Sequence, residues 1–202
     1  MLREQDIKVW EAARPFLDVR SNDEHTLFSY YWAKQLLDFY PEGDADVVLP
    51  AILLHDVGWK KIPIEKVLES FGPKMKYPEL RRQHEVEGVA IAKIKLEELG
   101  YGKQHINQIC ALIDGHDTTK EARSLNDSLL KDADKLWRFT RHGNETIQSW
   151  FHISMSEVHE ILRKQFPDLL TEKGKLFATQ MLEIAELKEN LTQYIPNVSA
   201  EK

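Results

Sequence analysis

Six residues of this 202-residue chain have the side-chain types that bind divalent metal ions. Imidazole nitrogens and carboxylate oxygens are common ligands of first-row metals, and one carboxylate can bridge two ions. A metal held in this way lowers the pKa of a bound water and stabilises negative charge that develops during a reaction. The intervals between the six residues are long, so only the fold can bring them together. The six are His25, His55, Asp56, His84, His116 and Asp134.

The adjacent pair His55 and Asp56 is the most informative part of this set. It follows an apolar run, residues 51–54, and precedes Gly58. Burying an ionisable pair there costs roughly several kcal/mol unless the pair is hydrogen-bonded or holds a metal. Neighbours on a helix point about 100° apart, so both can reach one ion only near the helix end, where Gly58 lets the chain turn away. The alternative is a core histidine that is bonded to a backbone carbonyl.

Helical periodicity predicts an all-α chain. The expected helices cover residues 5–14, 23–40, 44–57, 79–99, 103–115 and 125–140, with further helices over 146–194 that are broken near Pro167. Pro50 implies either a kink in the third helix or a later start for it. On this pattern most of the six residues lie near helix ends or in first turns. We expect one domain over residues 1–202.

Residues 59–78 are irregular, with a short helix expected over residues 64–71. This segment follows the His55–Asp56 pair and carries Lys60, Lys61, Lys74 and Lys76. It is either a loop that covers a site or a solvated basic loop.

Composition restricts the classes of function. The net charge is −6 and 30% of the residues are charged, which indicates a soluble protein and argues against general nucleic-acid binding. The single cysteine, Cys110, fits a reducing compartment. No apolar run approaches the roughly 18 residues that span a membrane, and the N-terminus lacks the apolar core of a signal peptide. We therefore expect a cytoplasmic protein without a membrane partner.

The order His25, His55-Asp56, Asp134 on successive helices resembles the HD-domain superfamily of metal-dependent phosphohydrolases. Two strings carry the resemblance: Leu-Leu-His-Asp-Val-Gly ending at Gly58, and Lys-Asp-Ala-Asp-Lys-Leu ending at Leu136. It covers about residues 20–140 and implies an HD helical bundle, followed by a helical extension over about 146–197. It also implies that Asp134 is the ligand of the second string, while Asp132 lies behind the ligands or on the surface.

The strings that begin at His84 and His116 resemble those of HD proteins with a second metal, notably the HD hydrolases of diadenosine tetraphosphate. The resemblance implies that His25, His55 and Asp134 hold one ion and that His84 and His116 hold another, with Asp56 between them. Trp59 stands where many relatives have a lysine, and Lys60 or Lys61 could replace that lysine.

The expected function is hydrolysis of a phosphoester or phosphoanhydride in a small, nucleotide-like substrate. His55 and Asp56 are the expected catalytic residues, and one or two divalent ions are the expected cofactor, with Fe, Mn, Mg, Co, Ni and Zn not distinguished. Acids that could orient the metal-bound histidines are Glu85, Asp117 and Asp132. Cations that could bind phosphate are Lys60, Lys61, Lys135 and Arg138.

Several alternatives stay open at this point. The same ligands occur in HD-fold di-iron oxygenases, and a non-catalytic nucleotide sensor could keep a metal site. His84 could be an exposed histidine, and Asp134 could be a surface acid paired with Lys131 or Arg138. The amphipathic segment 173–191 could complete the core or form a homodimer contact. Four histidines have no partner pattern: His105, His142, His152 and His159.

Overall fold

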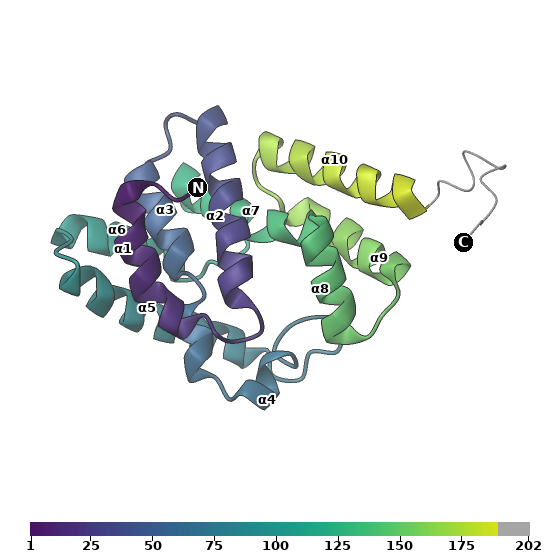
Figure 1. The fold of residues 1–202 in the computed structure, drawn as a ribbon, viewed down its shortest axis with the longest axis horizontal. Coiled ribbons are helices and arrows are strands. Elements are labelled where there is room, and N and C mark those ends of the chain that lie inside the picture. The colour runs from purple at the N-terminus through teal and green to yellow at the C-terminus, as the bar shows by residue number, and fades with distance from the viewer. Residues whose placement is uncertain (190–202) are drawn as a thin grey trace.

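A computed structural model describes residues 1–189, and all regular structure in that range is helical. This confirms the all-α prediction, while the ends of the predicted segments 146–197 and 173–191 lie outside the described residues. Figure 1 shows α8, α9 and α10 together on one side of the molecule. The elements are α1 (Glu4–Ala13), η1 (Arg14–Phe16), α2 (Asn22–Phe39), α3 (Ala45–Leu54), η2 (Val57–Lys61), α4 (Ile64–Val67), α5 (Glu79–Glu98), α6 (Lys103–Ile113), α7 (Leu125–Phe139), α8 (Arg141–Phe151), α9 (Met155–Gln165), η3 (Phe166–Asp168) and α10 (Glu172–Glu189).

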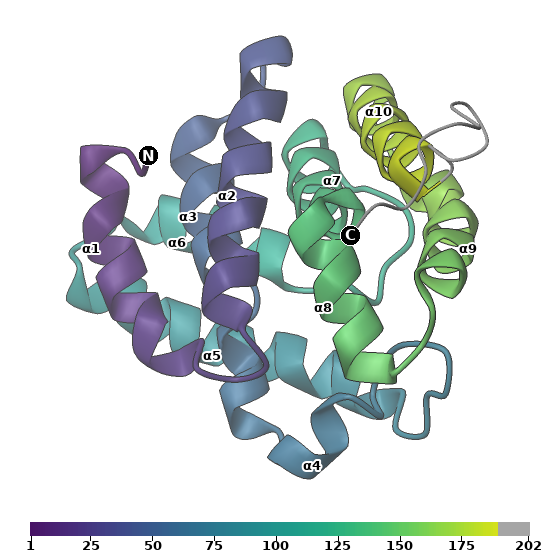
Figure 2. The ribbon, with the colours of Figure 1, turned by 45° about the vertical axis from the view of Figure 1, so that its right-hand side comes forward.

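The apolar helix α3 occupies the centre of the bundle. Every residue from Val47 to Leu54 is buried, as expected for a helix that is apolar on all sides. Four helices contact it: α1, α2, α6 and α7. Figure 2 shows α1, α3 and α2 next to one another. Because α3 is fixed on all sides, the polar residues that follow its last turn enter the protein interior instead of reaching the solvent.

The boundaries of α3 resolve the question that Pro50 raised. The Asp44 side chain accepts a hydrogen bond from the Asp46 N–H (3.0 Å) and caps the helix start. The helix therefore contains Pro50, and the later start is wrong. It ends at Leu54, so His55 and Asp56 follow the helix, although the prediction included them in it.

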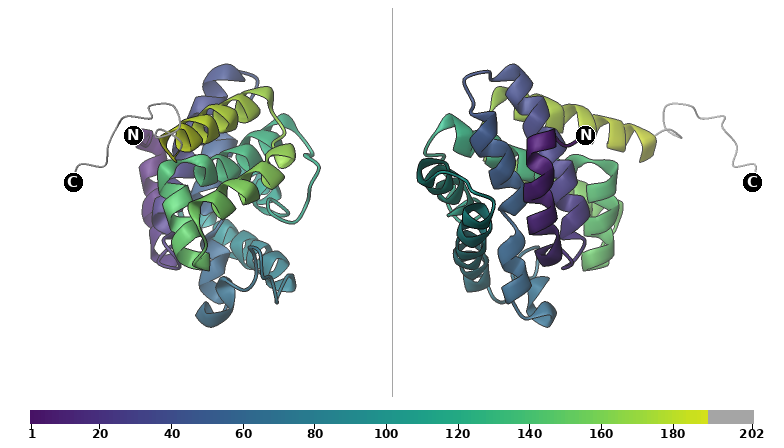
Figure 3. Two further views of the ribbon diagram at one scale, coloured as in Figure 1. Left: turned by 90° about the vertical axis from the view of Figure 1, so that its right-hand side faces the viewer. Right: turned by 60° about the vertical axis from the view of Figure 1, so that its left-hand side comes forward.

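The proline-rich segment after η2 is less helical than predicted. Its helix α4 covers only Ile64–Val67, where residues 64–71 were expected. Phe71 and Tyr77 pack against a small apolar cluster that includes Trp59 and Leu80. This segment is therefore anchored to η2 and α5. Figure 3 shows α4 and α10 at opposite ends of the molecule.

The C-terminal helices are tied to α7 by capping interactions. The Thr140 hydroxyl accepts a hydrogen bond from the Gly143 N–H, so α8 begins directly after α7 and earlier than predicted. Buried Asp132 accepts hydrogen bonds from the Leu170 and Thr171 N–H groups just before α10. Asp132 thus anchors α10, and the expectation that it orients a histidine is wrong.

Gly58 offers a test of this packing. A Cβ atom at Gly58 would lie 1.8 Å from the His84 carbonyl oxygen and 2.5 Å from the Gly88 nitrogen. We expect Gly58→Ala to force η2 away from α5 and lower the free energy of unfolding by about 3 kcal/mol or more, measured by chemical denaturation. A Cβ at Gly102 meets no atom within 4 Å, so Gly102→Ala should lower the same quantity by about 1 kcal/mol or less. Equal effects of the two substitutions would contradict the close approach.

Candidate metal centre

The fold brings all six predicted ligands to one buried place. None is more than 6% exposed. They come from five separate segments: the first turn of α2, the residues after α3, α5, the residues after α6, and α7. His84 is fully buried, which contradicts its alternative interpretation as an exposed histidine.

Three of the residues form one ligand set around the His25 imidazole. Its Nε2 lies 3.1 Å from the Asp134 Oδ1 and 3.1 Å from the His55 Nε2. The His55 Nε2 lies 3.5 Å from the same Asp134 oxygen. The Asp56 Oδ2 faces this set, at 3.4 Å from the His25 Nε2 and 3.7 Å from the His55 Nε2.

A second set faces the other oxygen of Asp56. The Nε2 atoms of His84 and His116 are 3.4 Å apart, and each lies 3.6 Å from the Asp56 Oδ1. Asp56 therefore lies between two histidine pairs and presents a different oxygen to each. A carboxylate in this position could bridge two ions.

The distances within the two sets fit divalent metal ions. Nitrogen and oxygen ligands at about 2.0–2.2 Å from an ion lie about 3–4 Å from one another, and all the separations above are in that range. The histidine tautomers also fit. The Nδ1–H groups of His55 and His116 donate to the carbonyl oxygens of Ile52 and Ile113, both at 2.8 Å, which leaves the Nε2 lone pairs for an ion. The clustered side chains could therefore hold metal.

The electrostatics of the centre favour positive charge. Burial alone would raise the pKa of Asp56 and Asp134, but the neighbouring histidines and the cations Arg20 and Arg138 hold both pKa values well below the usual range. Burial would lower the pKa of His116, but the Asp56 carboxylate outweighs it and raises that pKa to about 9. Two carboxylates thus remain charged in a buried site, and they attract cations.

Aromatic residues fix two of the ligand histidines. The Trp59 ring stacks on His84, with centroids 4.0 Å apart and planes 12° from parallel. Its indole N–H donates to the Asp56 Oδ1 at 3.0 Å. The Trp137 ring contacts His25 edge-on at 4.8 Å. Trp59 therefore positions both His84 and Asp56.

The acids Glu85 and Asp117 have a different role from the predicted one. The Asp117 carboxylate accepts two hydrogen bonds from Arg81, and Glu85 accepts from the N–H groups of Asp117 and Thr118. These bonds hold the segment that follows His116. Within residues 1–189, backbone carbonyls orient His55 and His116, so the prediction that these acids do so is wrong.

The four predicted phosphate-binding cations lie at different distances from the centre. Lys60 pairs with Asp18 on the surface, and Lys61 is exposed. Lys135 donates to the Lys131 carbonyl oxygen, and burial lowers its pKa. In the described part of the chain, Arg138 alone of the four contacts a ligand, with a 3.4 Å separation from the Asp134 Oδ2. Replacement of a lysine at position 59 by Lys60 or Lys61 stays a prediction.

The remaining histidines lie outside the centre. His105 is exposed on α6, and His152 ends α8 in a left-handed conformation. His142 accepts from the Trp137 indole and pairs with Glu24, while His159 bonds to Asn144.

One residue that sequence reasoning missed contacts the centre. The Arg20 guanidinium reaches the Asp56 Oδ2, with an N–O distance of 3.5 Å. Arg20 precedes α2 and belongs to no recognisable string. The only signal available in the sequence is the following Ser-Asn-Asp helix start, which places Arg20 near the first turn that carries His25.

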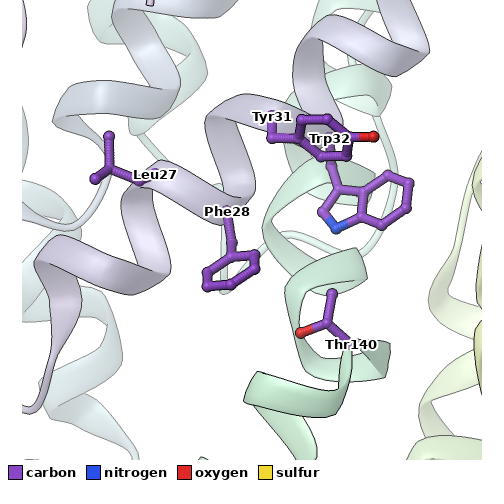
Figure 4. A pocket seen from close by; sticks show the side chains of 5 residues that line it. All are labelled: Leu27, Phe28, Tyr31, Trp32 and Thr140. Carbon is purple, nitrogen blue, oxygen red and sulfur yellow. The ribbon is translucent and has the colours of Figure 1, made fainter. Parts of the chain in front are cut away.

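Two hollows of the molecular surface lie away from these residues. One, of about 390 Å³, is lined by apolar side chains of α2 and by Thr140 (Figure 4). The other, of about 440 Å³, lies along α1 and η1. Neither is lined by any of the six ligands. In residues 1–189, no helix combines the length and the apolar character needed to cross a membrane.

Comparison with known families agrees with the geometry. Residues 22–138 match the HD domain. The chain belongs to the HD-domain family. That family consists mostly of metal-dependent phosphohydrolases, so membership confirms the resemblance at the level of the superfamily and the predicted HD helical bundle. Neither the curated proteins nor the solved structures contain a match to this HD-domain chain. Arg20 and the helices α8, α9 and α10 lie outside the matched residues.

Metal binding should stabilise the folded protein, because the ligands converge only in the native state. At a free metal concentration of about 100 times the dissociation constant, the free energy of unfolding should rise by about 2.7 kcal/mol. For a chain of this size that raises Tm by about 5–10 °C, measured by calorimetry before and after chelation. His105→Ala should respond like the unaltered protein, because His105 is exposed on α6. A Tm that is unaffected by chelation and reloading would contradict a metal centre here.

Proposed function

We propose that this HD-domain protein is a phosphohydrolase with two metal ions, similar to the HD hydrolases of diadenosine tetraphosphate. Its substrate is a small nucleotide-like molecule in which a phosphoester or phosphoanhydride bond is cleaved. The observation that supports this most directly is the position of Asp56. Its Oδ2 faces His25 and His55, and its Oδ1 faces His84 and His116. A site for a single ion needs only one of these two sets.

The ions and the protein would make different contributions to catalysis. Bound ions would lower the pKa of a water and stabilise the oxygens of a phosphoryl transition state. The chain supplies the ligand sets: His25, His55 and Asp134 for one ion, and His84 and His116 for the other, with Asp56 shared. Burial of these groups lowers the local dielectric and strengthens each charge interaction relative to water.

The surrounding residues keep this arrangement in place. The Trp59 indole N–H donates to the Asp56 Oδ1 and so keeps one carboxylate oxygen directed at each histidine set. Arg138 contacts the Asp134 oxygen that does not face His25 and His55. It can neutralise a substrate phosphate on that side. His55 and Asp56 are assigned as catalytic residues because of their positions in the two ligand sets.

Asp56→Ala tests the proposal directly, because it removes the ligand that both sets share. We expect the variant to lose bound metal and to lower kcat/KM by at least about 1000-fold, measured on a phosphodiester and a panel of nucleotides. Asp38→Ala changes an exposed aspartate of α2 and should leave both measurements unchanged. Full metal content together with unaltered turnover in Asp56→Ala would refute the assignment.

The number of ions is tested by His84→Ala. Because His84 belongs only to the second set, the variant should bind one ion fewer per chain than the unaltered protein, measured by elemental analysis after reloading. Retention of the His25, His55 and Asp134 set should preserve the other ion. An unaltered protein with one ion per chain, insensitive to His84→Ala, would exclude the dinuclear form. Bound iron with oxygen uptake and no phosphate release would instead favour the oxygenase alternative.

A further inference from the structure

Arg20 is a buried cation with too few partners. Its side chain is 14% exposed. One guanidinium nitrogen makes a long 3.5 Å contact with the Asp56 Oδ2, and the Nε is buried without a hydrogen-bond partner among the described residues. A buried charge is unfavourable unless it is paired and hydrogen-bonded. The Nε–H donor of Arg20 is thus unused, and its guanidinium lies next to the Asp56 carboxylate.

Three aromatic rings hold the guanidinium at this position. Its central carbon lies 4.2 Å from the Phe71 ring centroid, 4.8 Å from Trp59 and 5.3 Å from Trp150. Contacts of this kind are favourable for a desolvated cation. The rings come from η2, from the segment after α4, and from α8. Phe71 also contacts Trp150 edge-on, which joins the three segments around Arg20.

The backbone at Arg20 is strained in a way that aims this side chain. Arg20 and Ser21 have φ angles of 45° and 60°, in the left-handed region. Each such residue costs roughly 1–2 kcal/mol relative to ordinary backbone, and residues of this kind cluster at ligand-binding sites. The turn lets Arg20 point back toward the centre just before α2 begins.

We propose that Arg20 binds the phosphoryl oxygens of the substrate beside Asp56, and that Trp59, Phe71 and Trp150 hold its guanidinium for this task. The inference rests on the proposed phosphohydrolase function. The planar guanidinium presents several N–H groups in one plane and can bind two oxygens of a phosphoryl group. Arg20 then supplies the positive charge that a lysine at position 59 would give, and Trp59 becomes its aromatic support.

Both Arg20 and Trp150 lie outside residues 22–138, the part that matches the HD domain. The proposed phosphate site therefore draws on two residues from outside the matched part of the chain. It also gives α8 a role in the active site, because Trp150 reaches Arg20 from that helix.

The experiment measures binding of inorganic phosphate to the metal-loaded full-length protein by titration calorimetry. Because hydrogen bonds to a charged group are lost, Arg20→Met should weaken phosphate binding by about 10- to 100-fold when its metal content is matched to that of the unaltered protein. Arg20→Lys should show an intermediate loss, since it keeps the charge and loses the planar fork. Arg141→Met is the matched control, because that arginine is 77% exposed and pairs with Glu145 on the surface.

The aromatic support is tested separately at Trp150. Trp150→Leu should weaken phosphate binding, and Trp150→Phe should preserve most of it, because a phenyl ring keeps the contact with the guanidinium. Equal losses in these two variants would overturn the role of the ring. If Arg20→Met does not fold, the phosphate affinity of Arg20→Lys tests the role of Arg20 instead.

Phosphate affinity within twofold of the unaltered protein in a fully metal-loaded Arg20 variant would overturn the inference. So would a change in metal affinity alone, which would assign Arg20 to pairing with Asp56. These failures are distinct from failure of the proposed function: a protein that binds metal and phosphate through Arg20 but hydrolyses no phosphoester would refute only the latter.

Discussion

Asp56 places a carboxylate in the protein interior, between two pairs of imidazoles and within reach of Arg20. A buried carboxylate is stable only when positive charge or hydrogen-bond donors surround it. Here the surroundings include histidines on both sides, a guanidinium and the Trp59 indole N–H. Helices distant in sequence must all present such groups at one point, and this requirement explains why the helices of the bundle meet where they do.

The central helix meets this requirement through its apolar character. Because α3 is buried on every side, its last turn delivers His55 and Asp56 into the core. The close approach of Gly58 to the backbone of α5 then sets the depth of His84. Backbone carbonyls at the ends of α3 and α6 orient His55 and His116 in the same way, through bonds to residues three positions earlier. At two helix ends, a backbone carbonyl oxygen that lacks an intrahelical partner thus accepts a hydrogen bond from an imidazole and fixes its orientation.

The features that could be predicted from the sequence are those that depend on local sequence patterns. Helical periodicity located the long helices to within a few residues, and the His-Asp and Asp-Ala-Asp strings indicated residues that the fold brings together. The acids Glu85 and Asp132 were misassigned, because their partners are backbone N–H groups of loops whose course the sequence does not reveal. Asp117 was misassigned because its carboxylate pairs with Arg81, which lies 36 residues away in the sequence. The sequence likewise does not reveal that Lys60 pairs with Asp18 on the surface. Arg20 had no periodic signal, since it depends on two left-handed residues and on a ring from a distant helix.

The contacts of Trp59 link the segment after α3 to distant parts of the chain. An indole there can stack on His84 and hold Asp56, but it carries no charge for an anion. In the proposed phosphohydrolase a cation must then come from elsewhere, and contact with an indole face helps to hold a desolvated cation. Arg20 lies next to the Trp59 ring, and Phe71 and Trp150 also contact its guanidinium. The aromatic residue in the motif, the turn before α2 and the helix α8 are therefore linked physically, and a substitution at any one of them should affect the other two.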